Sequence, residues 1–191
     1  MSSSAPLYSH SFQLKADFEK NISCDEYSGK TVICEFSDPN PFKVLHVGHL
    51  YTSIVGDSIS RLVEFAGGKV VRANFGGDVG LHVAKTLFAV IRDGANTKDI
   101  ETIAAKYVEG TRAYEDDEAA KAEIVVLNKA IYQIAEAGEG KTVSINGLTV
   151  GGKPVAVEDV AKLYWQGRKV SYQYFDDFYL YIILKKKIHV F

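Results

Sequence analysis

Two histidines one helical turn apart are the residues of this sequence whose types and spacing most directly suggest chemistry. They stand in His46-Val-Gly-His49, where a proline-rich turn gives way to a helical pattern. A helix N-terminus offers N–H groups and a positive dipole end to phosphate. Two imidazoles at this spacing could donate hydrogen bonds to a phosphate whose charge grows during attack, and Gly48 would leave room for a nucleotide base. Alone the pattern is weak, because most such pairs are structural, and no further zinc ligands accompany it.

The pattern around these histidines predicts a β–α–β unit. Thr31–Phe36 is an apolar, β-branched run typical of a buried strand, and Lys69–Phe75 is a second one. Between them, helical spacing over 49–66 ends at Gly67-Gly68. The apolar residues that define this spacing are Leu50, Ile54, Ile59, Leu62, Val63 and Ala66. The strands should run parallel, and ligands of such sheets bind beyond the carboxyl ends of the strands, which is where 36–49 lies.

The rest of the sequence is mainly helical. Gly76–Gly80 leads into predicted helices at 81–92, about 97–115, about 117–137, and from about Glu158 onward. A β-hairpin is expected over 142–150, because Asn146-Gly147 is the preferred two-residue turn. We therefore divide the chain into a lead-in segment (1–30), a Rossmann-like nucleotide-binding half (31–95) and a mainly helical part (96–191).

Composition excludes several classes of protein. The 191 residues are 47% hydrophobic and 24% charged, as in ordinary globular proteins, and the net charge of −2 argues against a strongly basic nucleic-acid binder. The densest cationic run, Lys185–Lys187, is interpreted as a solvated helix end, with a phosphate contact as the alternative. Cys24 and Cys34 are expected to be free thiols in a reducing compartment. No signal peptide or membrane-spanning run is found, so the cytoplasm is expected.

The flanks of the histidine pair give it a wider context. Glu35-Phe-Ser-Asp-Pro-Asn40, followed by Lys43, His46 and His49, resembles the E-F-S-x-P-N…K…H-x-G-H block of class I arginyl-tRNA synthetases.

The likeness extends in order over about 31–85. It includes Leu50–Asp57 and Asn74–Gly80, the latter similar to the family's G-D-x-G segment. A weaker likeness returns at Tyr164-Trp165 and Ser171–Tyr179, where the family has an aromatic helix.

This resemblance implies the N-terminal part of an arginyl-tRNA synthetase catalytic domain. The fold would be α/β, a partial parallel sheet of the Rossmann-like HUP type with a helical C-terminal extension. The implied activity is that of an arginine–tRNA ligase, which uses ATP to activate arginine and transfers it to tRNA(Arg). Mg²⁺ would accompany the ATP, and no metal site on the protein itself is expected.

The resemblance also implies roles for single residues. The arginine-binding set would be Glu35, Ser37, Asn40 and His49. The ATP-binding set would be Lys43, His46, Gly48, His49 and Asp78. His46, His49 and Lys43 would be catalytic, with Lys43 neutralising phosphate charge in place of the family's K-M-S-K-S lysine.

Plainer interpretations stay open. Asn40 between two prolines could be a turn residue, Glu35 could cap a neighbouring strand, and Asp78 could end a glycine turn or cap the next helix. For the whole chain, the alternatives are a small HxGH-type nucleotidyltransferase and a non-catalytic ATP-binding relic.

The sequence also departs from the family. It lacks the N-terminal tRNA-elbow domain, a K-M-S-K-S loop, the later Y-x-x-x-D and Gln contacts to arginine, and the anticodon domain. Residues 180–191 differ from the expected G-x-x-F-D, so we expect a truncation or a reading-frame shift. An incomplete domain should expose a sheet edge and self-associate there. The C-terminal residues expected to lose their packing partners are Tyr172, Phe175, Phe178, Tyr179, Ile182 and Ile183.

Overall fold

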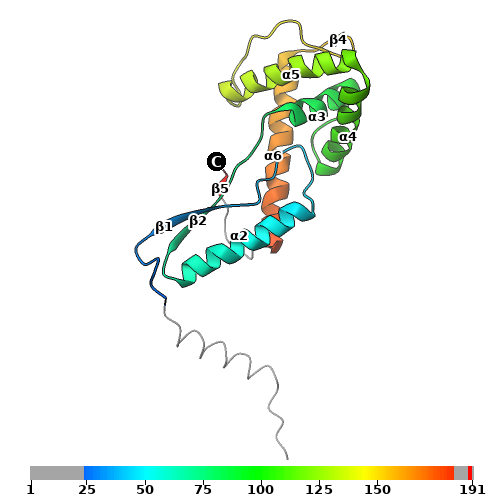
Figure 1. Cartoon of the computed structure of the whole chain (residues 1–191). Coiled ribbons are helices and arrows are strands. Elements are labelled where there is room, and N and C mark those ends of the chain that lie inside the picture. Colours follow the sequence, from blue (N-terminus) through cyan, green and yellow to red (C-terminus); the bar gives the residue numbers. More distant parts are fainter. Residues whose placement is uncertain (1–23, 183–188, 191) are drawn as a thin grey trace, which may run out of the picture.

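The chain combines a small parallel sheet with a larger helical part, and one long helix joins them (Figure 1). The computed structural model describes residues 24–182 and 189–190. The strands are β1 (Thr31–Glu35), β2 (Lys69–Asn74), β3 (Thr149–Val150), β4 (Lys153–Pro154) and β5 (His189–Val190). The helices are α2 (Val47–Phe65), α3 (Leu81–Arg92), α4 (Ile100–Asp116), α5 (Glu118–Ala137) and α6 (Val157–Ile182).

The β–α–β unit predicted from the sequence is confirmed. β1 and β2 are parallel, with Thr31 beside Lys69 and Glu35 beside Ala73. β5 adds a third parallel strand on the far side of β2, so the sheet order is β1-β2-β5. The carboxyl ends of β1 and β2 therefore lie at one edge of the sheet, next to the start of α2.

α2 does not use its apolar side to cover the sheet. Its buried residues are Ser53, Asp57, Ser60 and Val63, whereas Ile54, Ile59 and Leu62 are exposed. The cause is Arg72 of β2, a buried guanidinium that bonds Asp57 (3.0 Å) and Glu64 (2.8 Å). A buried charge must be paired, so the carboxylates of α2 face the sheet and its apolar side turns outward.

The helical part has its own core, and two of its helices begin at N-capping aspartates. Asp99 accepts a hydrogen bond from Thr102 N (2.7 Å) and starts α4, three residues later than predicted. Asp117 caps α5 in the same way. The core lies between α3, α4, α5 and α6, and its largest fully buried residues include Tyr164, Phe42, Phe88, Leu87, Ile103, Ile124 and Leu127.

The hairpin expected over 142–150 is wrong in position. The paired strands are β3 and β4, antiparallel, and the turn between them is Gly151-Gly152. Both glycines have positive φ (59° and 74°), and both donate backbone N–H bonds to Glu123, at 2.7 and 3.0 Å. The described residues on either side of Asn146-Gly147 do not pair as strands, whereas Gly151-Gly152 joins two paired strands and is held by the Glu123 carboxylate.

The expectation that the aromatic residues of α6 lack packing partners is wrong for two of them. Phe175 and Tyr179 are buried in a cluster with Phe36, the residue that follows β1. Tyr172, Phe178 and Ile182 are partly buried around it. Expectations about Ile183, Lys185–Lys187 and residues 1–23 lie outside the described residues. Among the described helices, none is long and apolar enough to cross a membrane.

Candidate functional site

The candidate site is built on the loop that follows β1. Phe36 N bonds Ala73 O (3.1 Å) and Phe75 N bonds Asp38 Oδ1 (2.9 Å), so the ends of β1 and β2 are tied together. Ser37, Asp38 and Phe42 all have positive φ, at 77°, 46° and 65°. Non-glycine residues in this conformation persist only where surrounding contacts hold them, as is common at ligand sites.

His46 and His49 cap α2 reciprocally. Gly48 N donates to His46 Nδ1 and His46 N donates to His49 Nδ1, both at 3.1 Å, and the two rings lie 3.9 Å apart. Because each Nδ1 accepts a hydrogen bond, the proton of each neutral ring is on Nε2. Burial, the neighbouring His46 and Lys43 lower the pKa of His49, while Asp38 raises it to a lesser extent. The pair thus holds two N–H donors at the head of the helix.

Gly48 is required by this cap. A Cβ at Gly48 would lie 2.8 Å from His46 Cε1, too close for any side chain without displacing the ring. The Gly48 N–H is also used by His46. The imidazoles, more than the backbone N–H groups expected from the sequence, are therefore the donors available here.

The charge of Lys43 acts on two histidines, His49 and His82. Lys43 Nζ lies 4.9 Å from the centre of the Tyr107 ring of α4, within cation–π range. His82 Nε2 lies 3.1 Å from Gly77 O. Burial and the charge of Lys43 lower the pKa of His82 to about 4, so its ring is neutral near pH 7. His82 was not predicted as a site residue, although it lies two residues after the G-D-x-G-like segment.

The residues predicted to bind arginine differ in their surroundings. Glu35 is exposed at the end of β1. Ser37 is buried and accepts a hydrogen bond from Tyr179 (2.9 Å), which itself accepts one from Asn74 Nδ2 (3.0 Å). Asn40 packs against Gly77, where a Cβ would come within 2.3 Å of its Oδ1. Tyr179 and Asn74 were not predicted as site residues, although both lie in segments that carry the resemblance.

Asp78 faces α6. Its Oδ2 accepts a 2.5 Å bond from Arg168 Nε. Arg168 also lies over the Tyr172 ring, 4.7 Å from its centre, and burial raises the pKa of Tyr164 and of Tyr172. Asp78 therefore anchors the loop after β2 to α6. The loop after β1 is also anchored to α6, because Ser171 Oγ accepts a hydrogen bond from Phe42 N at 3.0 Å.

Known proteins of one family are similar to this chain in sequence and in fold. The family described as class I (R) tRNA synthetases, catalytic domain, matches residues 14–144. The chain belongs to this family. It is 47% identical over 68 residues to the arginine–tRNA ligase of Borrelia turicatae, which is 36% of this chain and 12% of that enzyme. It is 33% identical over 102 residues to that of Haemophilus influenzae, 52% of this chain and 18% of the enzyme.

Two solved arginyl-tRNA synthetases resemble the fold. The Plasmodium falciparum enzyme has a TM-score of 0.52 at 22% identity, over 87% of this chain and 24% of that one. The Thermus thermophilus enzyme has a TM-score of 0.50 at 27% identity, over 65% of this chain and 22% of that enzyme. The chain thus spans about a quarter or less of these synthetases.

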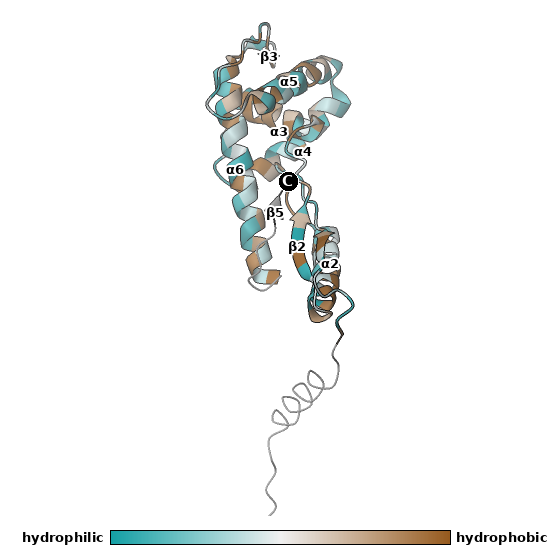
Figure 2. Cartoon of the chain, turned by 90° about the vertical axis from the view of Figure 1, so that its left-hand side faces the viewer, coloured by the Kyte–Doolittle hydropathy of each residue, from teal (hydrophilic) through white to brown (hydrophobic). Residues whose placement is uncertain are grey.

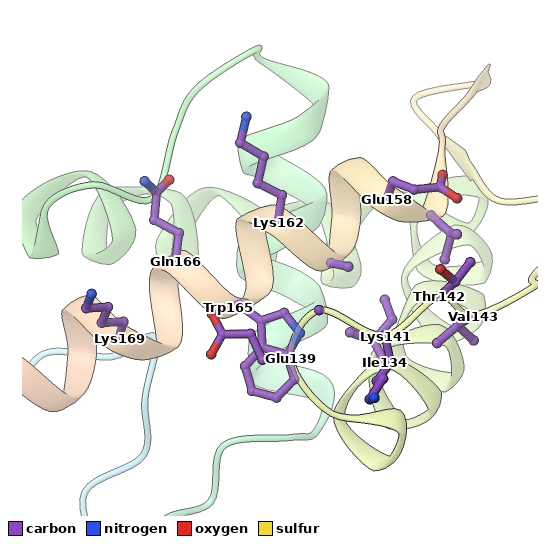
Figure 3. Close-up of a pocket in the computed structure, with 13 residues that line it drawn as sticks. Ile134, Glu139, Lys141, Thr142, Val143, Glu158, Lys162, Trp165, Gln166 and Lys169 are labelled. Atoms are coloured by element: carbon purple, nitrogen blue, oxygen red, sulfur yellow. The ribbon is translucent and has the colours of Figure 1, made fainter.

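A second hollow lies in the helical part of the fold. A cavity of about 580 Å³ is lined by the end of α5, the 139–143 segment and the start of α6 (Figure 3). Trp165, Lys141, Lys162 and Lys169 are on its wall. It shares no residue with the predicted ATP or arginine sets, so it is not the site that the family resemblance indicates.

Proposed function

We propose that this chain binds ATP through His46 and His49 and forms one wall of an arginine-activating site. The supporting observation is the reciprocal cap, which leaves both Nε2–H groups free to donate and fixes the orientation of each ring. Because the chain spans only 12% and 18% of two of its relatives, the ligase activity itself is part of the proposal.

In the proposed reaction, an arginine carboxylate oxygen attacks the α-phosphorus of ATP. The bond to the β-phosphate oxygen breaks, diphosphate leaves and arginyl-adenylate forms; transfer of the arginyl group to tRNA(Arg) follows. The protein contributes position and charge stabilisation without a covalent enzyme intermediate. His46 and His49 would donate to the phosphate oxygens while charge develops there, and Lys43 would move from Tyr107 to neutralise it.

Mg²⁺ would arrive with the nucleotide. The described part of the chain holds no group of three or more His, Cys, Asp or Glu that could bind a metal ion. Oxygen ligands from the phosphates suit Mg²⁺, which keeps several waters and needs few protein ligands. Asp78 Oδ2 bonds Arg168, so the other carboxylate oxygen, Oδ1, is the one that could contribute.

Arginine would be held by Glu35, Ser37, Asn40 and His49. An exposed carboxylate such as Glu35 can pair with a guanidinium or ammonium group by charge-assisted hydrogen bonds. These residues form one side of a pocket, so we expect weak arginine affinity and no charging of tRNA by the chain alone.

Isothermal titration tests the proposal directly. The chain is titrated with an unreactive ATP analogue, with arginine, and with both together. Binding of the analogue that is enhanced by arginine supports the synthetase site. Analogue binding that arginine does not change would favour a nucleotidyltransferase. Binding of both ligands without diphosphate exchange would favour a relic, and no analogue binding would contradict the proposal.

We propose the cytoplasm as the compartment of this protein, which fractionation of the source cells would test.

A further inference from the structure

The outer side of α2 is an exposed apolar surface. We define the apolar flank as seven exposed residues of this helix: Val47, Tyr51, Ile54, Val55, Ile59, Leu62 and Phe65. Figure 2 shows apolar (brown) turns along α2. Taking about 200 Å² for each fully exposed large side chain, the flank presents roughly 700 Å², more than the ~300–600 Å² of the largest apolar patch on an ordinary monomer. A patch of this size indicates a surface that binds another polypeptide segment.

The apolar flank faces directly away from the sheet. The buried side of α2 carries Ser53, Asp57 and Ser60, and Asp57 bonds Arg72 of β2 at 3.0 Å. Successive helical residues turn by about 100°, so the centre of the flank lies roughly 180° from these buried residues. The two serine hydroxyls bond carbonyl oxygens of the preceding turn, at 2.6 and 2.8 Å. The polar side is therefore satisfied against the sheet, and the apolar flank needs a cover from outside the sheet.

The chain reaches the described region beside the last turn of α2. Tyr27 N donates a hydrogen bond to Ala66 O (2.9 Å), and a Cβ at Gly67 would lie 3.5 Å from Ser28 Cα. Residues 1–23, which we name the N-terminal segment, precede this contact. With 19 residues at about 1.5 Å each, α2 is about 28 Å long, and a helix as long as the N-terminal segment would span about 34 Å. The segment is therefore joined to one end of the flank and is long enough to reach the other.

The N-terminal segment has an apolar pattern that matches the flank. Leu7, Leu14, Phe18 and Ile22 recur at intervals of seven and four residues, the spacing of one helical face. Most of the residues between them are polar, so a helix with this sequence would be amphipathic. Such a helix can bury its apolar side against the apolar side of a second helix.

We propose that the N-terminal segment docks on the apolar flank as an amphipathic helix parallel to α2. The direction follows from the chain path, because residue numbers in the segment rise toward the end of α2 at which Tyr27 is bonded. The expected neighbours are Leu7 with Tyr51, Phe18 with Leu62 and Ile22 with Phe65, at a nearly constant offset of 43 or 44 positions. Two parallel helices of equal pitch require such an offset. At the same offset, Leu14 falls between Val55 and Ile59, so every residue of the pattern meets the flank.

The covalent connection favours this occupant over a second copy of the chain. A segment joined to the flank by a few residues is present there at an effective concentration on the order of mM. A second copy competes only at the concentration of the free protein, which is far lower in a dilute solution. The docked segment would also cover the residues through which two copies could associate. We therefore expect the flank to be closed within one chain.

Cross-linking of the full chain tests the expected neighbours. In a background with Cys24→Ser and Cys34→Ser, Phe18→Cys is combined with Leu62→Cys, and a short bismaleimide is added to dilute protein. The control combines Phe18→Cys with Val126→Cys, at an exposed apolar residue of α5. We expect a cross-link within one chain that forms faster than in the control by a factor on the order of ten or more, because docking raises the effective concentration.

Hydrogen exchange of the full chain gives a second measurement. The amides of residues 7–22 should exchange more slowly than those of the same segment as an isolated peptide, because docking protects them. Leu62→Glu places a charge on the flank and should remove this protection, whereas Val126→Glu should leave it unchanged. Both substitutions are at exposed residues, so the fold of the described part should be retained.

Three results would overturn the proposal. The first is a cross-link that forms no faster than in the control. The second is exchange over residues 7–22 that equals that of the peptide or is unaffected by Leu62→Glu. The third is a cross-link that forms only between chains, with a dimer in light scattering that Leu62→Glu dissociates. That result would assign the apolar flank to a second copy of the chain.

Discussion

At the scale of single residues, the capping of α2 by the histidine pair can be separated from the ATP binding that we propose for it. Each Nδ1 is committed to capping α2, and each Nε2–H remains for a ligand. The spacing of two histidines could be interpreted from the sequence as phosphate-binding. The reciprocal cap could not be predicted from the sequence, because the residues preferred at the N-cap of a helix are Ser, Thr, Asp and Asn.

Two substitutions of His46 separate the roles. His46→Asn keeps a side-chain acceptor for Gly48 N, whereas His46→Ala removes it. Both lose the Nε2–H, so both should weaken binding of the ATP analogue by about 1.5–3 kcal/mol, the value of a hydrogen bond to a charged group. Only the alanine variant should also lose about 1 kcal/mol of stability. Unchanged nucleotide affinity in both variants, measured by titration, would contradict the assignment.

The Asn74–Tyr179–Ser37 chain gives a second residue-scale prediction. Tyr179→Phe removes the hydroxyl that joins two buried polar side chains and should cost about 1–3 kcal/mol in urea unfolding. Tyr181→Phe, on the exposed side of the same helix, should change stability by less than about 0.5 kcal/mol. Equal effects of the two variants would show that the buried chain contributes nothing specific.

At the scale of elements, the sequence predicted most helices and the parallel strands well. Helix boundaries came within a few residues because Asp99 and Asp117 are ordinary caps. The orientation of α2 could not be predicted, because a pattern of apolar residues does not show that Arg72 would be buried and require Asp57 and Glu64. The packing of α6 against Phe36 joins residues 139 positions apart, which local patterns cannot reveal.

The contact of α3 with α4 gives a prediction opposite to helix propensity. An alanine in place of a helical glycine normally adds about 1 kcal/mol of stability. A Cβ at Gly110 of α4, however, would lie 1.8 Å from the carbonyl oxygen of Lys85 in α3. Gly110→Ala should therefore separate the helices and destabilise the fold by about 1–3 kcal/mol. Glu115→Ala, exposed on the same helix, is the control for propensity alone. A more stable Gly110→Ala variant would refute this close packing.

At the scale of the whole molecule, the two parts are joined by contacts that meet at the candidate site. α6 runs from the helical part to the sheet (Figure 1), and on the way bonds Asp78 through Arg168 and Phe42 through Ser171. A change at the site should therefore be felt in global stability. The family resemblance implies that Asp78 binds ATP, whereas nothing in the sequence indicates that its observed partner, Arg168, stands ninety residues later.

His82 should make global stability fall as the solution is acidified. Its folded pKa of about 4 lies below the ordinary 6.5, so the unfolded chain binds more protons between these values. Stability from this residue is complete above pH 6.5 and is lost as pH falls toward 4, by about 2 kcal/mol between pH 7 and pH 5. His82→Gln keeps an N–H donor for Gly77 O and does not titrate. Urea unfolding at pH 7 and pH 5 should show a loss of stability in the wild type that exceeds the loss in the variant by this amount. The contribution of His49 is the same in both proteins and cancels in the comparison. Parallel losses in the two proteins would mean that His82 is not the buried neutral ring described here.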